Sequence, residues 1–263
     1  MRIWIQLPSQ RPSNVIAPQA YLDLIEKIKR PDTEVSFHVM PLGPCIPGFG
    51  GFAYQGMRFL NDREILRAMS RAQSEGYDAV FVADWFDCAL RAARQILSIP
   101  VVGVAEASMV QASMMGLRFA VVTADPRYVA EMTELIRLYG MSSRAIESRP
   151  VRAVRLNEQE FLGCISSDID SLIQAFTASA KEAIAEGADT IISGCGLMAS
   201  FLSRAGIKEI MGVPVIDPIF AGLKMAELLV DLKKAGLPAV SRRGYFEEIP
   251  AQMLEQATAS GLF

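Results

Sequence analysis

The feature that most constrains this chain is an internal repeat. Residues 75–100 read EGYDAVFVADWFDCALRAARQILSIP, and residues 186–214 read EGADTIISGCGLMASFLSRAGIKEIMGVP. Each copy opens with EG-x-D and continues with a short apolar run, a helical segment and a strand entered through proline. Because a repeat of this kind fixes an architecture before any single residue does, it predicts two similar α/β halves.

The apolar run in each copy indicates a buried parallel strand, because it is short and stops abruptly at small or polar residues. Six residues after the aspartate of each EG-x-D stands Asp84 in the first copy and Cys195 in the second. Ligands of open α/β sheets bind at the carboxyl ends of the strands. We therefore expect Asp84 and Cys195 to lie at the ends of equivalent strands and to face each other across a cleft.

The predicted elements alternate along the whole chain, which favours a parallel sheet in each half. Strands are expected at residues 1–7, 34–40, 78–83, 101–104, 118–123, 151–155, 190–193 and 215–216. Helices are expected at residues 21–28, 60–73, 89–97, 106–115, 128–139, 167–186, 197–211 and 219–234. The last of these helices should pack back on the first half. The predicted domains are therefore residues 1–104 plus 217–263, and residues 105–216.

The connection at residues 41–51 is rich in glycine and proline and also contains Cys45. A connection of this length is usually functional or mobile, so it is either a lid over the site or a plain surface loop.

Composition excludes several classes of protein. The net charge of −3 and the lack of a basic run give no electrostatic case for binding nucleic acid. No apolar run approaches the roughly 18 residues that cross a bilayer. The N-terminus lacks the pattern of a signal peptide, so a cytoplasmic location is the expectation.

Cysteine and histidine usage argues against a metal site. The four cysteines have no CxxC spacing in a chain of 263 residues, which disfavours a disulfide framework or a zinc ribbon. The single histidine, His38, lies inside a predicted strand. A site built from Asp84, Asp87 and Cys195 would lack histidine and any known ligand spacing, so no metal is expected.

Two interpretations are open for each residue at the strand ends. Cys195 is either a small buried apolar residue or a functional thiol. The flanking Gly194 and Gly196 favour function, because they let a substrate approach, and the amides of the following helix would lower the pKa of the thiol. Asp84 is either a helix N-cap or a catalytic acid. Trp85 and Phe86 either wall an apolar pocket or belong to the core.

The segments DAVFVADWFDCALRAARQILSIPVVGVAEAS, RFAVVTADP and GADTIISGCGLMAS resemble the hydantoin racemase branch of the aspartate/glutamate racemase superfamily. The resemblance implies two pseudo-symmetric α/β domains with flavodoxin-like parallel sheets and an active site in the cleft between them. It implies no cofactor, and a homo-oligomer. In that superfamily two cysteines, one in each domain, act as acid and base on opposite faces of a carbon next to a carbonyl or carboxylate. The second cysteine matches Cys195, whereas the first falls at Asp84.

The resemblance thus implies a cofactor-independent racemase or isomerase whose substrate is a small carboxylate or cyclic imide. Hydroxyls and amides of Ser9, Ser108, Thr123 and Gly196 are expected to hold the substrate oxygens. An aspartate normally ionises near pH 4, so the departure at Asp84 keeps a decarboxylase or lyase with Cys195 as sole proton donor as an alternative. A second alternative is a small-molecule binder without catalysis.

Overall fold

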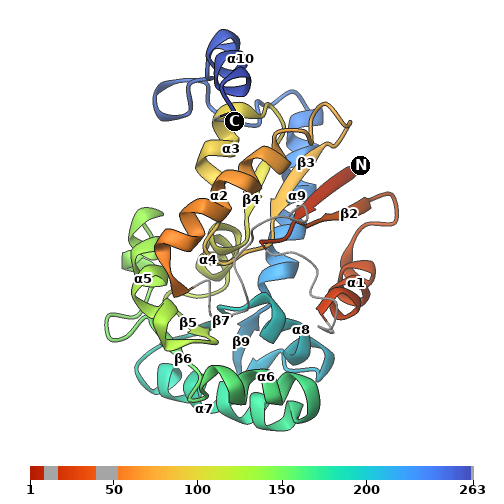
Figure 1. The fold of residues 1–263 in the computed structure, drawn as a ribbon. Coiled ribbons are helices and arrows are strands. Elements are labelled where there is room, and N and C mark those ends of the chain that lie inside the picture. Colours follow the sequence, from red (N-terminus) through yellow and green to blue (C-terminus); the bar gives the residue numbers. More distant parts are fainter. Residues whose placement is uncertain (9–16, 40–52, 262–263) are drawn as a thin grey trace.

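Two β-sheets organise the computed structural model, which describes residues 1–8, 17–39 and 53–261 (Figure 1). The strands are β1 (Arg2–Gln6), β2 (Glu34–His38), β3 (Ala79–Val82), β4 (Val101–Gly103), β5 (Phe119–Thr123), β6 (Val151–Ala153), β7 (Thr190–Ser193), β8 (Glu209–Ile210) and β9 (Val213–Ile216). The helices are α1 (Ala17–Ile28), α2 (Gln55–Met69), α3 (Leu90–Ile96), α4 (Val104–Met115), α5 (Val129–Leu138), α6 (Glu158–Ser167), α7 (Ile169–Ala185), α8 (Gly196–Arg204), α9 (Pro218–Lys234) and α10 (Ala251–Ala259). Single turns of 3-10 helix are η2 (Pro126–Tyr128), η3 (Ser142–Arg144) and η4 (Gly244–Phe246).

The two sheets have the same strand order. The first runs β2-β1-β3-β4 and the second runs β6-β5-β7-β9, followed by β8 at its edge. All pairs are parallel except β8 with β9, which is antiparallel. In each half the first strand lies between the second and the third, which is the order of flavodoxin-like sheets. The predicted α/β fold with two pseudo-symmetric halves is therefore confirmed.

The aspartates of the two EG-x-D segments accept equivalent hydrogen bonds from backbone amides. The Asp78 carboxylate accepts a hydrogen bond from the amide of Arg2 at 2.7 Å. The Asp189 carboxylate accepts from the amides of Leu117 at 2.7 Å and Arg118 at 2.9 Å. Each aspartate thus holds the start of the first strand of its half beside the start of the third, and β3 and β7 are equivalent strands.

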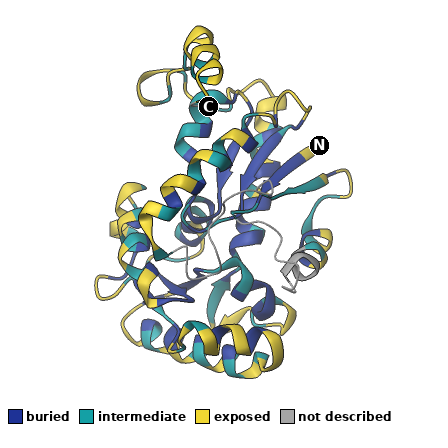
Figure 2. Cartoon of the chain, in the orientation of Figure 1, coloured by how far each residue is buried: buried dark blue, intermediate teal, exposed yellow. Residues whose placement is uncertain are grey.

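Strands β3, β4, β5 and β7 are buried along their whole length, as their continuous apolar runs predict, whereas the edge strand β2 is mostly half-buried (Figure 2). Neighbouring residues of one strand enter different cores: Ile3 and Ile5 point into the core shared by the two halves, whereas Trp4 packs under α2 and α3. The shared core also takes side chains from α4, α9 and the inner face of the second sheet. Helices α6, α7 and α8 cover the outer face of the second sheet.

The last long helix, α9, returns to the first half and packs on β3 and β4. A Cβ at Gly222 would lie 2.1 Å from the ring of Phe81, so only glycine allows the helix to come this close. Glu227 of α9 accepts hydrogen bonds from the Arg30 amide and the Thr33 hydroxyl, both at 2.8 Å. The return of α9 agrees with the expected discontinuity, and the domain division at residues 104/105 and 216/217 stays a prediction.

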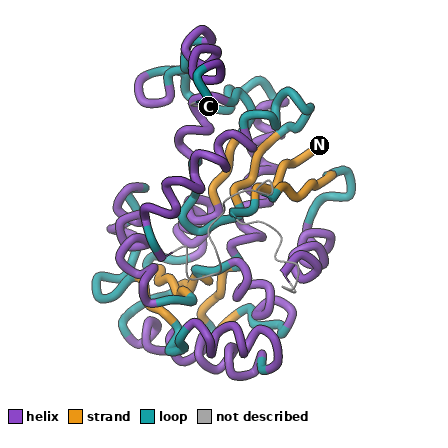
Figure 3. The backbone as a smooth tube through the Cα atoms, in the orientation of Figure 1, coloured by secondary structure: helices purple, strands orange, loops and turns teal. Residues whose placement is uncertain are grey.

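Three parts of the chain differ from the sequence prediction (Figure 3). The helix expected at residues 197–211 ends at Arg204, because Gly206 takes φ +76° and β8 follows. Helix α6 was not expected, although Asn157 and Glu160 form a capping box at its start. Helix α10 was also missed; it projects from the molecule and has no buried residue, so no apolar face marks it.

Some expectations fall on parts of the chain that the structure does not describe. Ser9 and the loop at residues 41–51 lie outside the described residues, and both remain predictions. Within residues 1–8, 17–39 and 53–261, no helix is long and apolar enough to span a bilayer. The same residues contain no cluster of three or more His, Cys, Asp or Glu side chains placed to hold a metal ion.

Candidate active site

The segment after β3 makes a tight turn around the side chain of Asp84. Asp84 Oδ1 accepts a hydrogen bond from the Phe86 amide at 2.9 Å and one from the Cys88 thiol at 3.2 Å. Burial raises the pKa of the Asp84 carboxyl, while these two hydrogen bonds and the charge of Arg58 oppose the rise. Asp84 as a whole residue is half-buried.

Asp87 fixes this turn from inside the protein. Its backbone has φ +49°, which is unusual for a residue other than glycine. Its carboxylate accepts the amides of Ala105 and Glu106, both at 3.0 Å, at the start of α4. A Cβ at Gly103 would lie 2.4 Å from the same carboxyl group. Asp87 therefore has a structural role: from the turn after β3, it binds two free amides in the first turn of α4.

The segment after β7 places Cys195 at the N-terminus of α8. The Gly194 amide donates to the carbonyl of Val122 at 2.7 Å, and the Thr123 hydroxyl donates to the carbonyl of Gly194 at 3.3 Å. A Cβ at Gly194 would lie 2.7 Å from Val121 Cγ1, so the turn depends on glycine. Cys195 has extended backbone angles and caps α8. Cys195 as a whole residue is half-buried, whereas Gly194 and Thr123 are buried.

The ends of β3 and β7 meet. The indole Nε1 of Trp85 donates a hydrogen bond to the carbonyl of Ser193 at 2.9 Å, which joins the two halves directly beside Asp84 and Cys195. The charge of Asp84 also raises the pKa of the Cys195 thiol, so the two groups interact through space. These observations support the shared site that the repeat predicts.

The predicted lowering of the pKa of Cys195 is wrong. Burial raises the pKa of this thiol to about 11, while hydrogen bonds from the Met198 and Leu197 amides lower it by less. The helix N-terminus acts in the expected direction, but removal of the thiolate from water is the larger effect. At neutral pH Cys195 is therefore a protonated thiol and a candidate proton donor.

Sequence reasoning missed two buried residues beside the site, Arg58 of α2 and Tyr128 of η2. The Arg58 guanidinium lies 4.2 Å from the ring centroid of Phe86 and forms an ion pair with Glu131. The rings of Phe86 and Tyr128 pack edge to face at 5.2 Å. Burial raises the pKa of Tyr128, and the charges of Cys195, Asp125 and Asp84 raise it further. Neither residue belongs to the repeat, so no sequence signal pointed to them.

The structure places the remaining predicted site residues as follows. Trp85 is buried and bridges the halves, whereas Phe86 is half-buried. Gly196 is the first residue of α8. Ser108 is fully buried, and its hydroxyl donates to the carbonyl of Val104 at 2.6 Å within α4. Ser108 as a substrate-binding residue therefore stays a prediction. The Thr123 hydroxyl likewise supports the glycine turn.

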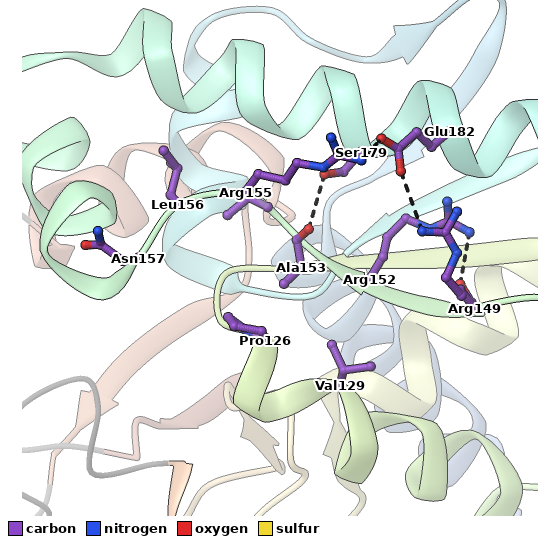
Figure 4. A pocket seen from close by; sticks show the side chains of 11 residues that line it. Pro126, Val129, Arg149, Arg152, Ala153, Arg155, Leu156, Asn157, Ser179 and Glu182 are labelled. Carbon is purple, nitrogen blue, oxygen red and sulfur yellow. Dashed lines mark hydrogen bonds and ion pairs between the residues drawn. The ribbon is translucent and has the colours of Figure 1, made fainter.

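A pocket between other elements lies away from these residues (Figure 4). It has a volume of about 490 Å³ and lies between η2, β6 and α7. Three arginines line it, but Glu182 or Glu186 pairs with each of them. The full lining is Pro126, Val129, Arg149, Arg152, Ala153, Val154, Arg155, Leu156, Asn157, Ser179 and Glu182. Because its charges are already neutralised within the protein and it holds neither Asp84 nor Cys195, this pocket is not the candidate site.

Comparison with known proteins shows the family of this chain. Residues 52–226 match the Asp/Glu/Hydantoin racemase family. A hydantoin racemase from Pseudomonas sp. (strain NS671) is 36% identical over 177 residues, which is 67% of this chain and 68% of that protein. A hydantoin racemase from Paenarthrobacter aurescens is 32% identical over 170 residues, covering 64% of this chain and 68% of that protein.

Solved structures give the same answer for the fold. The allantoin racemase from Klebsiella pneumoniae has a TM-score of 0.77 and 25% identity, covering 95% of this chain and 94% of that chain. A crystal structure of arylmalonate decarboxylase, at a TM-score of 0.52 and 17% identity, covers 88% of this chain and 92% of that chain. The second likeness concerns the fold alone.

Proposed function

Because the chain belongs to the Asp/Glu/Hydantoin racemase family and is a racemase, we propose that it inverts a carbon next to a carbonyl by proton transfer between Asp84 and Cys195. The observation that carries the proposal is the meeting of the two strand ends. Trp85 of the first half donates to Ser193 of the second, and this contact supports a site shared by the neighbouring residues Asp84 and Cys195.

The two groups have complementary protonation states. Cys195 carries its proton at neutral pH, because the pKa of its thiol is about 11. We assign the carboxylate form to Asp84: burial raises the pKa of its carboxyl, and hydrogen bonds from the Phe86 amide and the Cys88 thiol oppose the rise. A carboxylate on one face of the carbon can therefore remove a proton while the thiol on the other face supplies one. The opposite enantiomer requires protonated Asp84 and a Cys195 thiolate, which have the same total number of protons.

Amides at the start of α8 supply the electrostatic support. The amides of Leu197 and Met198 lower the pKa of the Cys195 thiol, so they stabilise the thiolate when it forms. The amide of Gly196 lies at the same helix end and remains our candidate, with Ser9 and Gly194, for binding a substrate carbonyl. Negative charge that develops on such an oxygen is stabilised by amides held in place. No cofactor enters this mechanism.

The substrate class comes from the relatives. We propose a 5-substituted hydantoin, the class of five-membered cyclic ureide whose stereocentre adjoins a ring carbonyl, since relatives named hydantoin racemase and allantoin racemase resemble this chain. The carbonyl makes that C–H acidic enough for a carboxylate and a thiol to act on. The half-buried Phe86, packed on Tyr128, is our candidate for contact with the 5-substituent.

The test is a racemisation assay on each enantiomer of a 5-substituted hydantoin, with a sample without enzyme to measure spontaneous racemisation. The proposal is supported if each pure enantiomer loses its optical rotation and both samples end as the same racemic mixture. Turnover of a disubstituted malonate without racemisation would instead support a decarboxylase with Cys195 as sole donor, which a protonated thiol would also permit. Binding of the hydantoin without any turnover would contradict both.

A further inference from the structure

Behind Asp84 lies a row of acidic groups that the proposed function does not use. The Cys88 thiol donates to Asp84 Oδ1 at 3.2 Å and is itself almost fully buried, with 2% of its surface exposed. Asp62 of α2 also interacts with this thiol, because a hydrogen bond between the two side chains lowers the pKa of Asp62 and raises that of Cys88. The Cys88 thiol thus interacts with two carboxyl groups that come from different segments of the chain.

The surroundings of the Asp62 carboxyl group favour proton exchange. Its Oδ1 atom is enclosed and has no hydrogen-bond partner among the described residues. An ionised carboxylate with an unpartnered buried oxygen is costly, and a neutral one costs less. Burial raises the pKa of Asp62 to about 6, with the Cys88 thiol and the Ala89 amide opposing the rise. Asp62 is half-buried, so it retains the exposed surface that the thiol lacks.

The charged groups around this row come from several elements. Arg58 of α2 lowers the pKa values of both Asp84 and Asp62, although it also pairs with Glu131 of α5. On the ligand side, Asp84 interacts with Cys195 and with Tyr128. Arg58 thus interacts with two carboxyl groups, Asp84 and Asp62, and with the weak acids Cys88 and Tyr128. A single positive charge shared among four acidic groups favours retention of a proton within the group.

We propose that Cys88 and Asp62 form a proton relay behind Asp84. This inference rests on the proposed function, because it gives the proton taken from substrate a way off the base while the product still fills the site. When Asp84 has taken the proton, its O–H passes that proton to the sulfur of Cys88 as the thiol gives its own proton to Asp62. Asp84 is then a carboxylate again, Cys88 is again a thiol, and Asp62 is neutral until it loses the proton to water.

Both residues act through Asp84, so they are positioning residues and need a test that a purely structural role would not satisfy. The variants are Cys88→Ala, which removes the relay proton, Cys88→Ser, which keeps a donor of similar shape, and Asp62→Asn. Matched controls are Cys164→Ala, a buried thiol in α6, and Asp170→Asn, an exposed carboxylate on α7. Thermal unfolding of each variant checks that it folds.

The first readout is the titration of the aspartate carboxyl groups by carbon NMR on the unliganded protein, with Asp84→Asn and Asp62→Asn assigning the two signals. Cys88→Ala should raise the pKa of Asp84 by about one unit, a tenfold change in proton affinity, because the carboxylate loses its thiol donor. Cys88→Ser should leave it near the wild-type value. The second readout is kcat against pH, in which Cys88→Ala and Asp62→Asn should lose about tenfold or more at neutral pH and Cys88→Ser should recover most of the rate.

Wild-type titration and wild-type kcat in Cys88→Ala would overturn the relay, and so would a Cys88→Ser variant as slow as Cys88→Ala. The carboxyl titration needs no substrate. If the wild-type enzyme racemised nothing, the proposed function would fail, whereas the NMR result would still report whether Asp84, Cys88 and Asp62 share a proton.

Discussion

Trp85 and Ser193 join the two halves of the molecule through one hydrogen bond, 2.9 Å from the indole Nε1 to the carbonyl oxygen. Each residue stands next to a proposed proton-transfer group or one residue removed from it. The bond is buried and crosses between the halves, so it holds the end of β3 against the end of β7. The repeat places Asp84 and Cys195 at the ends of equivalent strands, and the Trp85–Ser193 bond brings these two strand ends together.

Replacement of the indole should therefore affect activity as well as stability. Trp85→Phe keeps an aromatic ring but leaves the Ser193 carbonyl without its donor, at a cost of about 1–3 kcal/mol in the free energy of unfolding. Trp4→Phe is the matched control, since Trp4 donates to Gln6 at 3.0 Å within the first half. Both variants should lose stability in urea unfolding, and only Trp85→Phe should also lower kcat. Equal kcat values would show that the bridge does not position the site.

Gly194 should tolerate no side chain. In Gly194→Ala the new methyl group would lie 2.7 Å from Val121 Cγ1, so the turn before Cys195 must shift. We expect a loss of about 1–3 kcal/mol, as for overpacking of a core, together with reduced activity. Gly163→Ala in α6 has no atom within 4 Å of the new methyl group and should be neutral or slightly stabilising. Denaturant unfolding of the pair measures the difference.

Asp87 should make stability fall as pH rises. Burial raises its pKa from 3.8 to about 7, so between these values the folded protein binds a proton that the unfolded chain releases. The contribution of this carboxyl to stability is present below pH 3.8 and is lost as pH rises to about 7. The slope for one group reaches about 1.4 kcal/mol per pH unit. Asp87→Asn should remove this slope in unfolding measurements across that range.

Asp125 is a control, because its carboxyl should make stability rise with pH. Burial would raise the pKa of its carboxyl, but hydrogen bonds from the Arg127 side chain and amide outweigh burial and lower it. Its contribution is therefore present above the unfolded value of 3.8 and is lost as pH falls. If Asp87→Asn and Asp125→Asn changed the pH dependence in the same direction, the assignment of Asp87 would be wrong.

Alkylation by iodoacetamide should report the raised pKa of Cys195. Because the thiolate is the reactive form, the rate at Cys195 should rise about tenfold for each pH unit and level off only near the pKa of about 11. Peptide mapping by mass spectrometry follows the modification of each cysteine. Cys88 should stay unmodified in the folded protein, since its thiol is buried and its pKa lies well above the usual value. Fast alkylation of Cys195 at neutral pH would contradict the account.

Local patterns predicted most of the framework. The strand at residues 190–193 was predicted with its observed bounds, and the two EG-x-D segments identified β3 and β7 as equivalent. Such features depend on the spacing of apolar residues along the chain and on residues that are neighbours in sequence. The exceptions were short or poorly marked elements: β8 has two residues, and α10 has no buried face.

The electrostatics of the site could not be predicted in the same way. Arg58, Tyr128 and Asp62 reach Asp84 only after α2 and η2 have packed against the strand ends. The sequence gives the helix that follows Cys195, and hence the direction in which its amides act. It does not give the depth of burial, and burial decides the pKa of Cys195.

The central claim is that Asp84 and Cys195 act on opposite faces of one carbon, and hydrogen exchange tests it most directly. Each enantiomer of a 5-substituted hydantoin is incubated in heavy water with the wild type, Cys195→Ser or Asp84→Asn, and with no enzyme, and NMR and chiral chromatography follow the stereocentre. The wild type should invert both enantiomers and introduce deuterium as it does so. Each variant should lose at least about two orders of magnitude in racemisation, because one face of the carbon has lost its acid or base.

The two variants should differ in the exchange that remains. Cys195→Ser should exchange only the enantiomer whose hydrogen faces Asp84, and Asp84→Asn only the other, in both cases without inversion. Racemisation at the wild-type rate by either variant would contradict the account.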